Sequence, residues 1–214
     1  AASDVYKRQG NRSYGALKNV ETTYYAYQFH MICVASNYRG CGKSEGTDAF
    51  GGDDVHDVIH LLDLCEKLNS VDTKNINMFG VSRGGMMTYE TLREDRRIHK
   101  AVVVAGVADC TMNYEEREDM RSLLTELIGG TPEQLPEEYS RRSAVAWADE
   151  INTPLLIFHT TGDDKVSIKQ ADKLVKQLKK NQKDYEYVTF ESNIHGDLRK
   201  TDVERIRKFF ETGT

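Results

Sequence analysis

Apolar residues in this chain occur in short runs, separated by longer stretches in which they recur every three or four positions. The short runs predict buried strands of a parallel sheet, because a strand that is covered on both faces is apolar throughout. The spaced stretches predict amphipathic helices. This alternation is typical of an α/β fold. We expect strands at residues 31–35, 76–79, 101–105, 154–159 and 185–190.

Helices are expected to connect these strands. An apolar stripe predicts a helix over residues 53–68, and Asp53 or Asp54 can cap its start. The stripe consists of Val55, Val58, Ile59, Leu62, Cys65 and Leu68. Further helices are expected from about Arg83, over residues 167–181, and after the strand at 185–190.

Residues 109–151, between the third and fourth expected strands, form an unusually long connection that is acidic and helical in pattern. Apolar residues recur at helical spacing at Met120, Leu123, Leu124, Leu127 and Ile128. Such an insertion is expected to lie above the sheet as a cap. Tyr114, Tyr139 and Trp147 could line a pocket there, although packing within the cap is the commoner role for aromatic residues at such positions.

Length and charge narrow the functional classes. The chain has 214 residues, enough for one domain with a full core. It carries 34 acidic against 29 basic residues, a net charge of −5, which argues against a nucleic-acid partner or an anionic membrane surface. The longest apolar run, residues 101–108, is far shorter than the roughly 20 residues of a membrane span, so none is expected.

The cysteines are widely separated, at Cys33, Cys41, Cys65 and Cys110. They include no C-x-x-C pair, which removes support for zinc-ribbon or thioredoxin chemistry. We interpret them as free thiols in a reducing compartment, which favours the cytoplasm. A signal peptide lost with the N-terminus would leave the compartment open.

The first nine residues show no periodicity, and the stretch 4–9 resembles the translated end of a transposase sequencing adapter. We interpret residues 1–9 as a cloning or assembly scar and residues 10–214 as a single domain that lacks its early strands. Missing strands would leave a sheet edge uncovered, through which the chain could form oligomers.

The strongest motif is Gly80-Val81-Ser82-Arg83-Gly84, which matches G-x-S-x-G between an expected strand and an expected helix. A sharp turn there would lift the Ser82 hydroxyl above the sheet, and Gly80 and Gly84 must be small for neighbouring chain to pass close by. The backbone N–H of Arg83, at the helix start, would point at a developing oxyanion. Ser82 is the candidate nucleophile.

A serine nucleophile needs a base and an acid, in the chain order Ser, Asp, His for the α/β-hydrolase arrangement. Asp163 and Asp164 follow the strand at 154–159 and are both candidates for the acid. His195 lies in the loop after the last strand and is the candidate base.

A metal site has little support. His56 and His60 superficially match the H-E-x-x-H zinc helix, but Asp57 replaces the glutamate and both histidines lie opposite the apolar stripe. His159 flanks a strand and is expected to be structural. We expect neither a metal nor an organic cofactor.

Four segments together resemble the catalytic domain of the prolyl oligopeptidase family of serine peptidases. They are residues 37–42, residues 80–85, the strand 154–159 leading to Asp163 and Val166, and His195-Gly196. The resemblance implies the α/β-hydrolase fold, with a mostly parallel sheet, helices on both faces and a helical cap. It also favours Asp163 as the acid, because the family's acid stands three residues before that valine.

The resemblance also implies a second oxyanion donor in a loop after an early strand. Gly10 and Asn11 stand where that loop would end, and they are our candidates beside Arg83. Cys41 departs from the family pattern, in which a serine is usual, and Thr160 follows His159 where the family has glycine.

The implied reaction is acyl transfer from a peptide or small-molecule substrate through Ser82, Asp163 and His195. A serine-type peptidase is our first interpretation. A carboxylesterase uses the same residues, and a non-catalytic fragment or binding protein could share the scaffold.

Overall fold

The strands of the chain form one parallel sheet. The computed structural model describes residues 3–7 and 19–211, and within them six strands lie in the order β2-β1-β3-β4-β5-β6. Every neighbouring pair is parallel. The strands are β1 (Ser3–Lys7), β2 (Ile32–Val34), β3 (Ile76–Val81), β4 (Lys100–Val104), β5 (Leu155–Thr160) and β6 (Tyr185–Phe190). The five strands expected from the sequence are thus confirmed, with small shifts at their ends.

Strand β1 comes from the segment that the sequence analysis set apart from the fold. Ser3 pairs with Ile32 on one side and with Ile76 on the other, so β1 fills the place between β2 and β3. A strand between β2 and β3 forms backbone hydrogen bonds with both of them. This pairing explains how a segment without apolar periodicity can form a strand there. That residues 1–9 are a scar, and that the chain associates through a sheet edge, both stay predictions.

Side chains alternate between the two faces of the sheet and build two cores. Met78, Val103 and Ile157 point to one face, whereas Phe79 and Val104 point to the other. All five side chains are buried. This explains the continuous apolar runs in the sequence, because both faces of the central strands are covered by helices.

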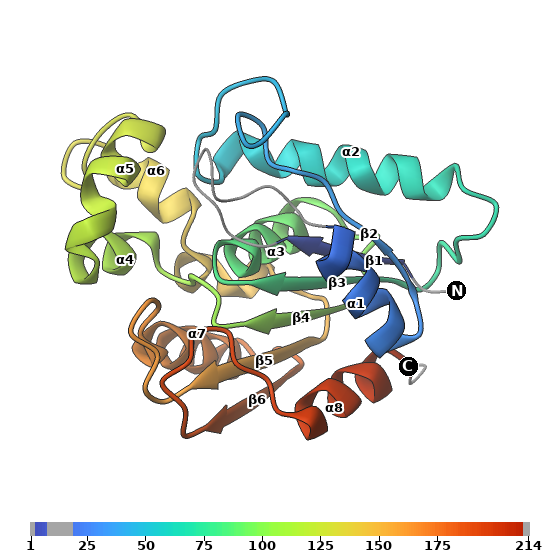
Figure 1. Cartoon of the computed structure of the whole chain (residues 1–214). Helices are drawn as coiled ribbons and strands as arrows, with labels where there is room; N and C mark the ends of the chain where they lie inside the picture. Colours follow the sequence, from blue (N-terminus) through green and yellow to red (C-terminus); the bar gives the residue numbers. More distant parts are fainter. Residues whose placement is uncertain (1–2, 8–18, 212–214) are drawn as a thin grey trace.

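Helices cover both faces, as the α/β interpretation predicts (Figure 1). The first face packs against α2 (Val55–Glu66), α3 (Arg83–Glu94) and α7 (Ile168–Lys180). The second face packs against α1 (Asn19–Phe29) and α8 (Lys200–Glu211).

Helix α1 was not predicted, because its tyrosines and threonines are only modest helix formers. Tertiary packing stabilises it, since the ring of Tyr25 lies 4.8 Å from that of Phe79.

The helix predicted over residues 53–68 is shorter than expected. Leu68 was assigned to its apolar stripe, and this was wrong, because α2 ends at Glu66 and Leu68 is 49% exposed. The true helix is shorter because the chain turns into a loop after Lys67.

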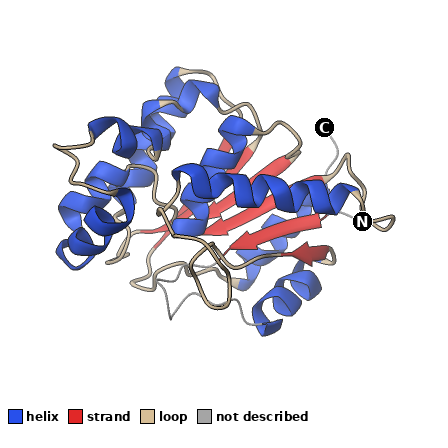
Figure 2. Ribbon diagram, turned by 90° about the horizontal axis from the view of Figure 1, so that it is seen from above, coloured by secondary structure: helices blue, strands red, loops and turns tan. Residues whose placement is uncertain are grey.

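The long connection after β4 forms a separate helical layer. It contains α4 (Cys110–Glu116), α5 (Glu118–Ile128) and α6 (Pro136–Arg141), followed by 3-10 turns at Ala144–Ala146 and Ala148–Glu150. Its apolar residues form a third core with Phe50 and Met86. Figures 1 and 2 show this cap at one end of the sheet, beyond the carboxyl ends of the strands. In the described part of the chain, no helix has the length and apolar character of a membrane span.

Candidate active site

Ser82 lies in a strained turn between β3 and α3. Its backbone has φ 59° and ψ −122°, a conformation that residues with a β-carbon rarely adopt. Neighbouring backbone holds the turn: Ser82 N–H donates to Val104 O at 3.0 Å, and Val107 N–H donates to Ser82 O at 3.2 Å. The side chain is nearly buried within the fold. The turn therefore has the form expected of a nucleophile elbow.

Glycines next to Ser82 allow the chain to turn this tightly. A β-carbon on Gly80 would lie 2.3 Å from both the Gly84 carbonyl oxygen and Thr88 Oγ1. The predicted need for a small residue at Gly80 thus has a steric basis, whereas the same need at Gly84 stays a prediction. Gly85 is equally constrained, because its β-carbon would lie 2.7 Å from Gly106 Cα. Sequence reasoning missed this second contact, because Gly106 is distant in sequence.

The residue after the nucleophile, Arg83, is the first residue of α3, so its amide belongs to the positive end of the helix. Its role as an oxyanion donor stays a prediction. Gly10 and Asn11, the other two candidates, lie outside the described residues. The Arg83 side chain points into the protein interior and is completely buried.

Asp163 and His195 are in direct contact. His195 Nδ1 lies 2.8 Å from Asp163 Oδ2 and 3.0 Å from Oδ1. The backbone N–H groups of Lys165 and Val166 also donate to Oδ1, at 2.9 and 3.0 Å. Burial favours the neutral acid, but the bonds from His195 and Val166 outweigh it and hold the pKa of Asp163 below its usual range. Asp163 is therefore an ionised partner for His195 near neutral pH.

The three predicted residues follow the carboxyl ends of three parallel strands: Ser82 follows β3, Asp163 follows β5 and His195 follows β6. The loop of His195 reaches back to the elbow, since a β-carbon on Gly196 would lie 2.9 Å from Val81 Cγ1. His195 Nε2 is buried and has no hydrogen-bond partner among the described residues. That nitrogen is the one that could exchange a proton with a serine hydroxyl.

The competing acid, Asp164, is in a different environment. Its side chain is 69% exposed and pairs only with the Nζ of Lys165, at 3.3 Å, among the contacts of the described chain. It is therefore poorly placed to orient a buried base. The adjacent Asp163 has a fully buried side chain.

His159, expected to be structural, is buried in β5 beside this pair. Its Nε2–H donates to Val166 O at 2.8 Å, and the same nitrogen lies 3.7 Å from Asp163 Oδ2. Burial holds the pKa of His159 below its usual range, so the ring is neutral. It braces the turn that carries Asp163.

The metal alternative finds no support in the geometry of the described residues, whereas one of the cap aromatics, Trp147, lines an open cavity of about 760 Å³ together with Arg93 and Arg141. His56 and His60 lie on the exposed side of α2, and the described residues contain no group of three or more metal-ligating side chains. Tyr139 and Trp147 are buried, Tyr139 packing edge-on against Tyr114 with ring centroids 5.8 Å apart. The packing interpretation of the cap aromatics agrees with these contacts.

The chain is similar to peptidases of one family. The model of the prolyl oligopeptidase family matches residues 19–212. The uncharacterized peptidase YtmA of Bacillus subtilis is 34% identical over 190 residues, covering 87% of this chain and 74% of that protein. Dipeptidyl aminopeptidase B of Saccharomyces cerevisiae is 31% identical over 169 residues, covering 73% of this chain and 19% of that protein.

Among solved structures, a puromycin-hydrolyzing peptidase of Mycobacterium tuberculosis superposes with a TM-score of 0.82 at 22% identity. It covers 97% of this chain, which spans 32% of that protein. An acylaminoacyl peptidase of Pyrococcus horikoshii superposes with a TM-score of 0.80 at 20% identity, covering 99% of this chain and 35% of that one. The chain thus spans about a third of these solved relatives, and their fold is the fold described above.

The family match, over residues 19–212, covers every described strand except β1, together with the helices and the cap, and it includes Ser82, Asp163 and His195. The chain belongs to the prolyl oligopeptidase family and is a serine hydrolase with the α/β-hydrolase fold.

Proposed function

We propose that this chain is a serine peptidase that works through an acyl-enzyme intermediate, with Ser82 as nucleophile, His195 as base and Asp163 as acid. The observation that carries the proposal is the contact of both Asp163 oxygens with His195 Nδ1, at 2.8 and 3.0 Å. It holds the Nδ1–H tautomer and leaves Nε2 as the basic nitrogen on the other side of the ring.

In the proposed reaction, Ser82 Oγ attacks the carbonyl carbon of the substrate while His195 Nε2 takes the hydroxyl proton. The carbonyl oxygen becomes an oxyanion, which the Arg83 amide stabilises. Collapse of the tetrahedral intermediate breaks the bond to the leaving amine, which receives the proton from His195. Water then attacks the acyl-enzyme carbonyl while His195 Nε2 takes a proton from it. The bond to Ser82 Oγ breaks, Oγ receives that proton from His195, and the carboxylic acid product leaves.

A peptide substrate is favoured over an ester because the relatives with the higher sequence identity are named as peptidases. The names of the solved relatives refer to puromycin and to acylaminoacyl substrates. This chain spans only about a third of those proteins, so which peptide it cleaves is left to experiment.

A fluorophosphonate probe followed by peptide mapping tests this proposal. We expect one adduct, on Ser82, that is lost in Ser82→Ala and in His195→Ala. Ser122→Ala is the matched control, because Ser122 is an exposed serine on the cap helix α5. Absence of labelling in a folded chain would overturn the proposal.

Substrate class follows from a second measurement. Two substrates carry the same acyl group, one as an amide and the other as an ester, and the kcat/KM values for their hydrolysis are compared. Hydrolysis of both supports a peptidase, since an enzyme that cleaves amides also cleaves activated esters. Hydrolysis of the ester alone would favour a carboxylesterase.

A further inference from the structure

The side chain of Arg83, the residue that follows the proposed nucleophile, lies in the protein interior. It is completely buried, although an arginine buried in this way must have its charge compensated. Its backbone amide and its guanidinium belong to the same residue, so whatever fixes one restrains the other. The proposed reaction needs that amide in a fixed position.

Two carboxylates hold the guanidinium from one direction. Nη1 donates to Asp48 Oδ2 at 2.8 Å, and Nη2 donates to the other oxygen of the same carboxylate. Nη2 also donates to Asp54 Oδ2, at 3.1 Å. The contact with Asp48 is bidentate, which fixes the orientation of the planar group as well as its position.

Two aromatic rings also pack against the Arg83 guanidinium. The guanidinium carbon lies 4.4 Å from the ring centroid of Tyr38 and 4.7 Å from that of Phe50. Both rings are buried. Stacking on aromatic rings together with bidentate pairing is an arrangement that lysine could not reproduce.

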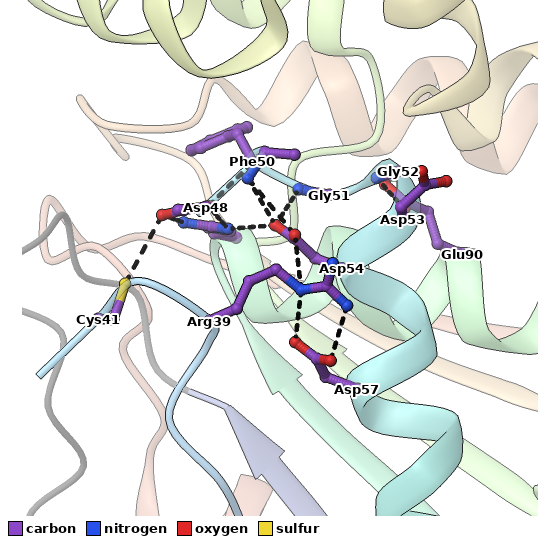
Figure 3. Close-up of polar contacts among 12 residues, drawn as sticks. Arg39, Cys41, Asp48, Phe50, Gly51, Gly52, Asp53, Asp54, Asp57 and Glu90 are labelled. Carbon is purple, nitrogen blue, oxygen red and sulfur yellow. Dashed lines mark hydrogen bonds and ion pairs between the residues drawn. The ribbon is translucent and has the colours of Figure 1, made fainter. Parts of the chain in front are cut away.

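The partners of Arg83 are themselves fixed to the backbone of one loop, residues 48–54. Asp48 accepts from Phe50 N–H at 2.9 Å, and Asp54 accepts from Ala49 N–H at 3.1 Å and Gly51 N–H at 3.2 Å. Figure 3 shows Asp48, which also accepts from Cys41 Sγ, at one end of this loop and Asp54 at the other end, at the start of α2. The guanidinium is therefore tied to a loop that its own hydrogen bonds hold in shape.

A second residue of α3 grips the same loop. Glu90, two turns after Arg83, accepts from Gly52 N–H at 2.7 Å with Oε2. Arg142 of the cap donates to Phe50 O at 3.2 Å and to Ala49 O at 3.1 Å. The loop thus connects the cap to α3. Arg83, the residue next to Ser82, makes the contact with this loop that lies nearest to the nucleophile along the chain.

From these contacts we infer that the Arg83 side chain is a positioning residue for the proposed reaction: its anchorage to Asp48 and Asp54 holds the oxyanion amide and the strained Ser82 turn in place. A backbone with positive φ at Ser82 persists only where its surroundings over-determine it. The inference rests on the proposed function, since it concerns how that amide is oriented.

The test separates the side chain from the amide. Arg83→Lys and Arg83→Met keep the backbone N–H but remove the bidentate and stacked anchor. We expect kcat to fall about 10- to 100-fold with KM within about threefold, because a displacement of about 1 Å from the reacting geometry can cost about 10² in rate. Rates are normalised to sites titrated with the fluorophosphonate probe, so that unfolded protein does not count.

The partner variants sharpen the test. Asp48→Asn removes the bidentate partner and is expected to reproduce the loss in kcat, whereas Asp54→Asn, which removes a single contact, is expected to have a smaller effect. Asp48→Asn leaves the arginine itself in place and carries the test if Arg83→Met does not fold.

Arg142→Lys is the matched control. It alters a buried arginine that binds the same loop but does not adjoin the nucleophile. If the Arg83 side chain has a merely structural role, the Arg83 variants and Arg142→Lys will all have a lower Tm and an unchanged kcat per titrated site. That result would overturn the inference. Absence of labelling in the unmodified chain would instead overturn the proposed function.

Discussion

Asp163 accepts from His195 Nδ1 with both carboxylate oxygens, whereas an aspartate one residue later makes no such contact. Asp163→Asn is expected to lower kcat by a factor on the order of 10⁴, because the amide would favour the wrong tautomer of the base. Rates of ester or amide hydrolysis per folded molecule measure this effect.

Asp164→Asn is the matched control for that prediction. It makes the same chemical change at the neighbouring exposed position, and its activity is expected to stay within about twofold of the unmodified chain, as is usual for an exposed pair. Equal losses in the two variants would reject Asp163 as the acid.

Ser82 is strained because its φ is 59°, and strain of this kind destabilises the folded state. Ser82→Gly is expected to be more stable than Ser82→Ala by about 1 kcal/mol, since glycine tolerates this conformation but loses more chain entropy on folding. Both variants lack the nucleophile and are expected to be inactive. Urea denaturation of the two variants provides the comparison, and a Ser82→Ala variant that is the more stable of the two would mean that the turn stores little strain.

Gly85 has no room for a side chain, because its β-carbon would lie 2.6 Å from Val103 Cγ1 as well as against Gly106. Gly85→Ala is expected to destabilise the fold by about 1–3 kcal/mol and to displace the elbow. Gly130→Ala is the matched control, since its added carbon would meet mainly the end of the Leu135 side chain, 3.0 Å away, which can move. Thermal unfolding of the two variants should differ, and similar Tm values would contradict the steric argument.

Glu90 links pH to stability. Burial raises the pKa of Glu90 to about 8, against 4.5 for an ordinary glutamate. Between these values the unfolded chain has lost the proton and the folded chain keeps it, so this contribution to stability falls as pH rises, by about 1.4 kcal/mol per pH unit.

Glu90→Gln removes the titrating group while retaining an oxygen that can accept from Gly52. The variant is expected to gain stability relative to the unmodified chain between pH 5 and pH 8. Urea denaturation at several pH values in that window checks the slope. Parallel pH dependences in the two proteins would show that Glu90 is ionised in the folded state throughout.

Much of the fold could be predicted from residue pattern alone. The buried strand at 154–159 and the final strand at 185–190 are local runs bounded by turn residues, so the sequence was sufficient to locate them. Ser82 was found because the motif combines a nucleophile with the glycines that its turn requires. Chain order predicted His195 as the base and left Asp163 and Asp164 as candidates for the acid, and the family resemblance favoured Asp163.

Other features could not be predicted because their cause lies between distant segments. Helix α1 has weak helical propensity and depends on Phe79 for its packing. The strand β1 exists through pairing with β2 and β3, not through its own apolar pattern. Leu68 fitted the helical spacing, but the chain leaves the helix before reaching it.

The sequence by itself determined which residues are candidates for the chemistry, since a nucleophile and a base are suggested by residue type and chain order. Only the tertiary structure decided how they are held. Arg83 could be chosen from the motif for its amide, but its guanidinium meets Asp48 only after α3 has packed beside the loop at 48–54. Burial, charge compensation and strain depend on what surrounds a side chain, and those surroundings come from parts of the chain that local pattern does not connect.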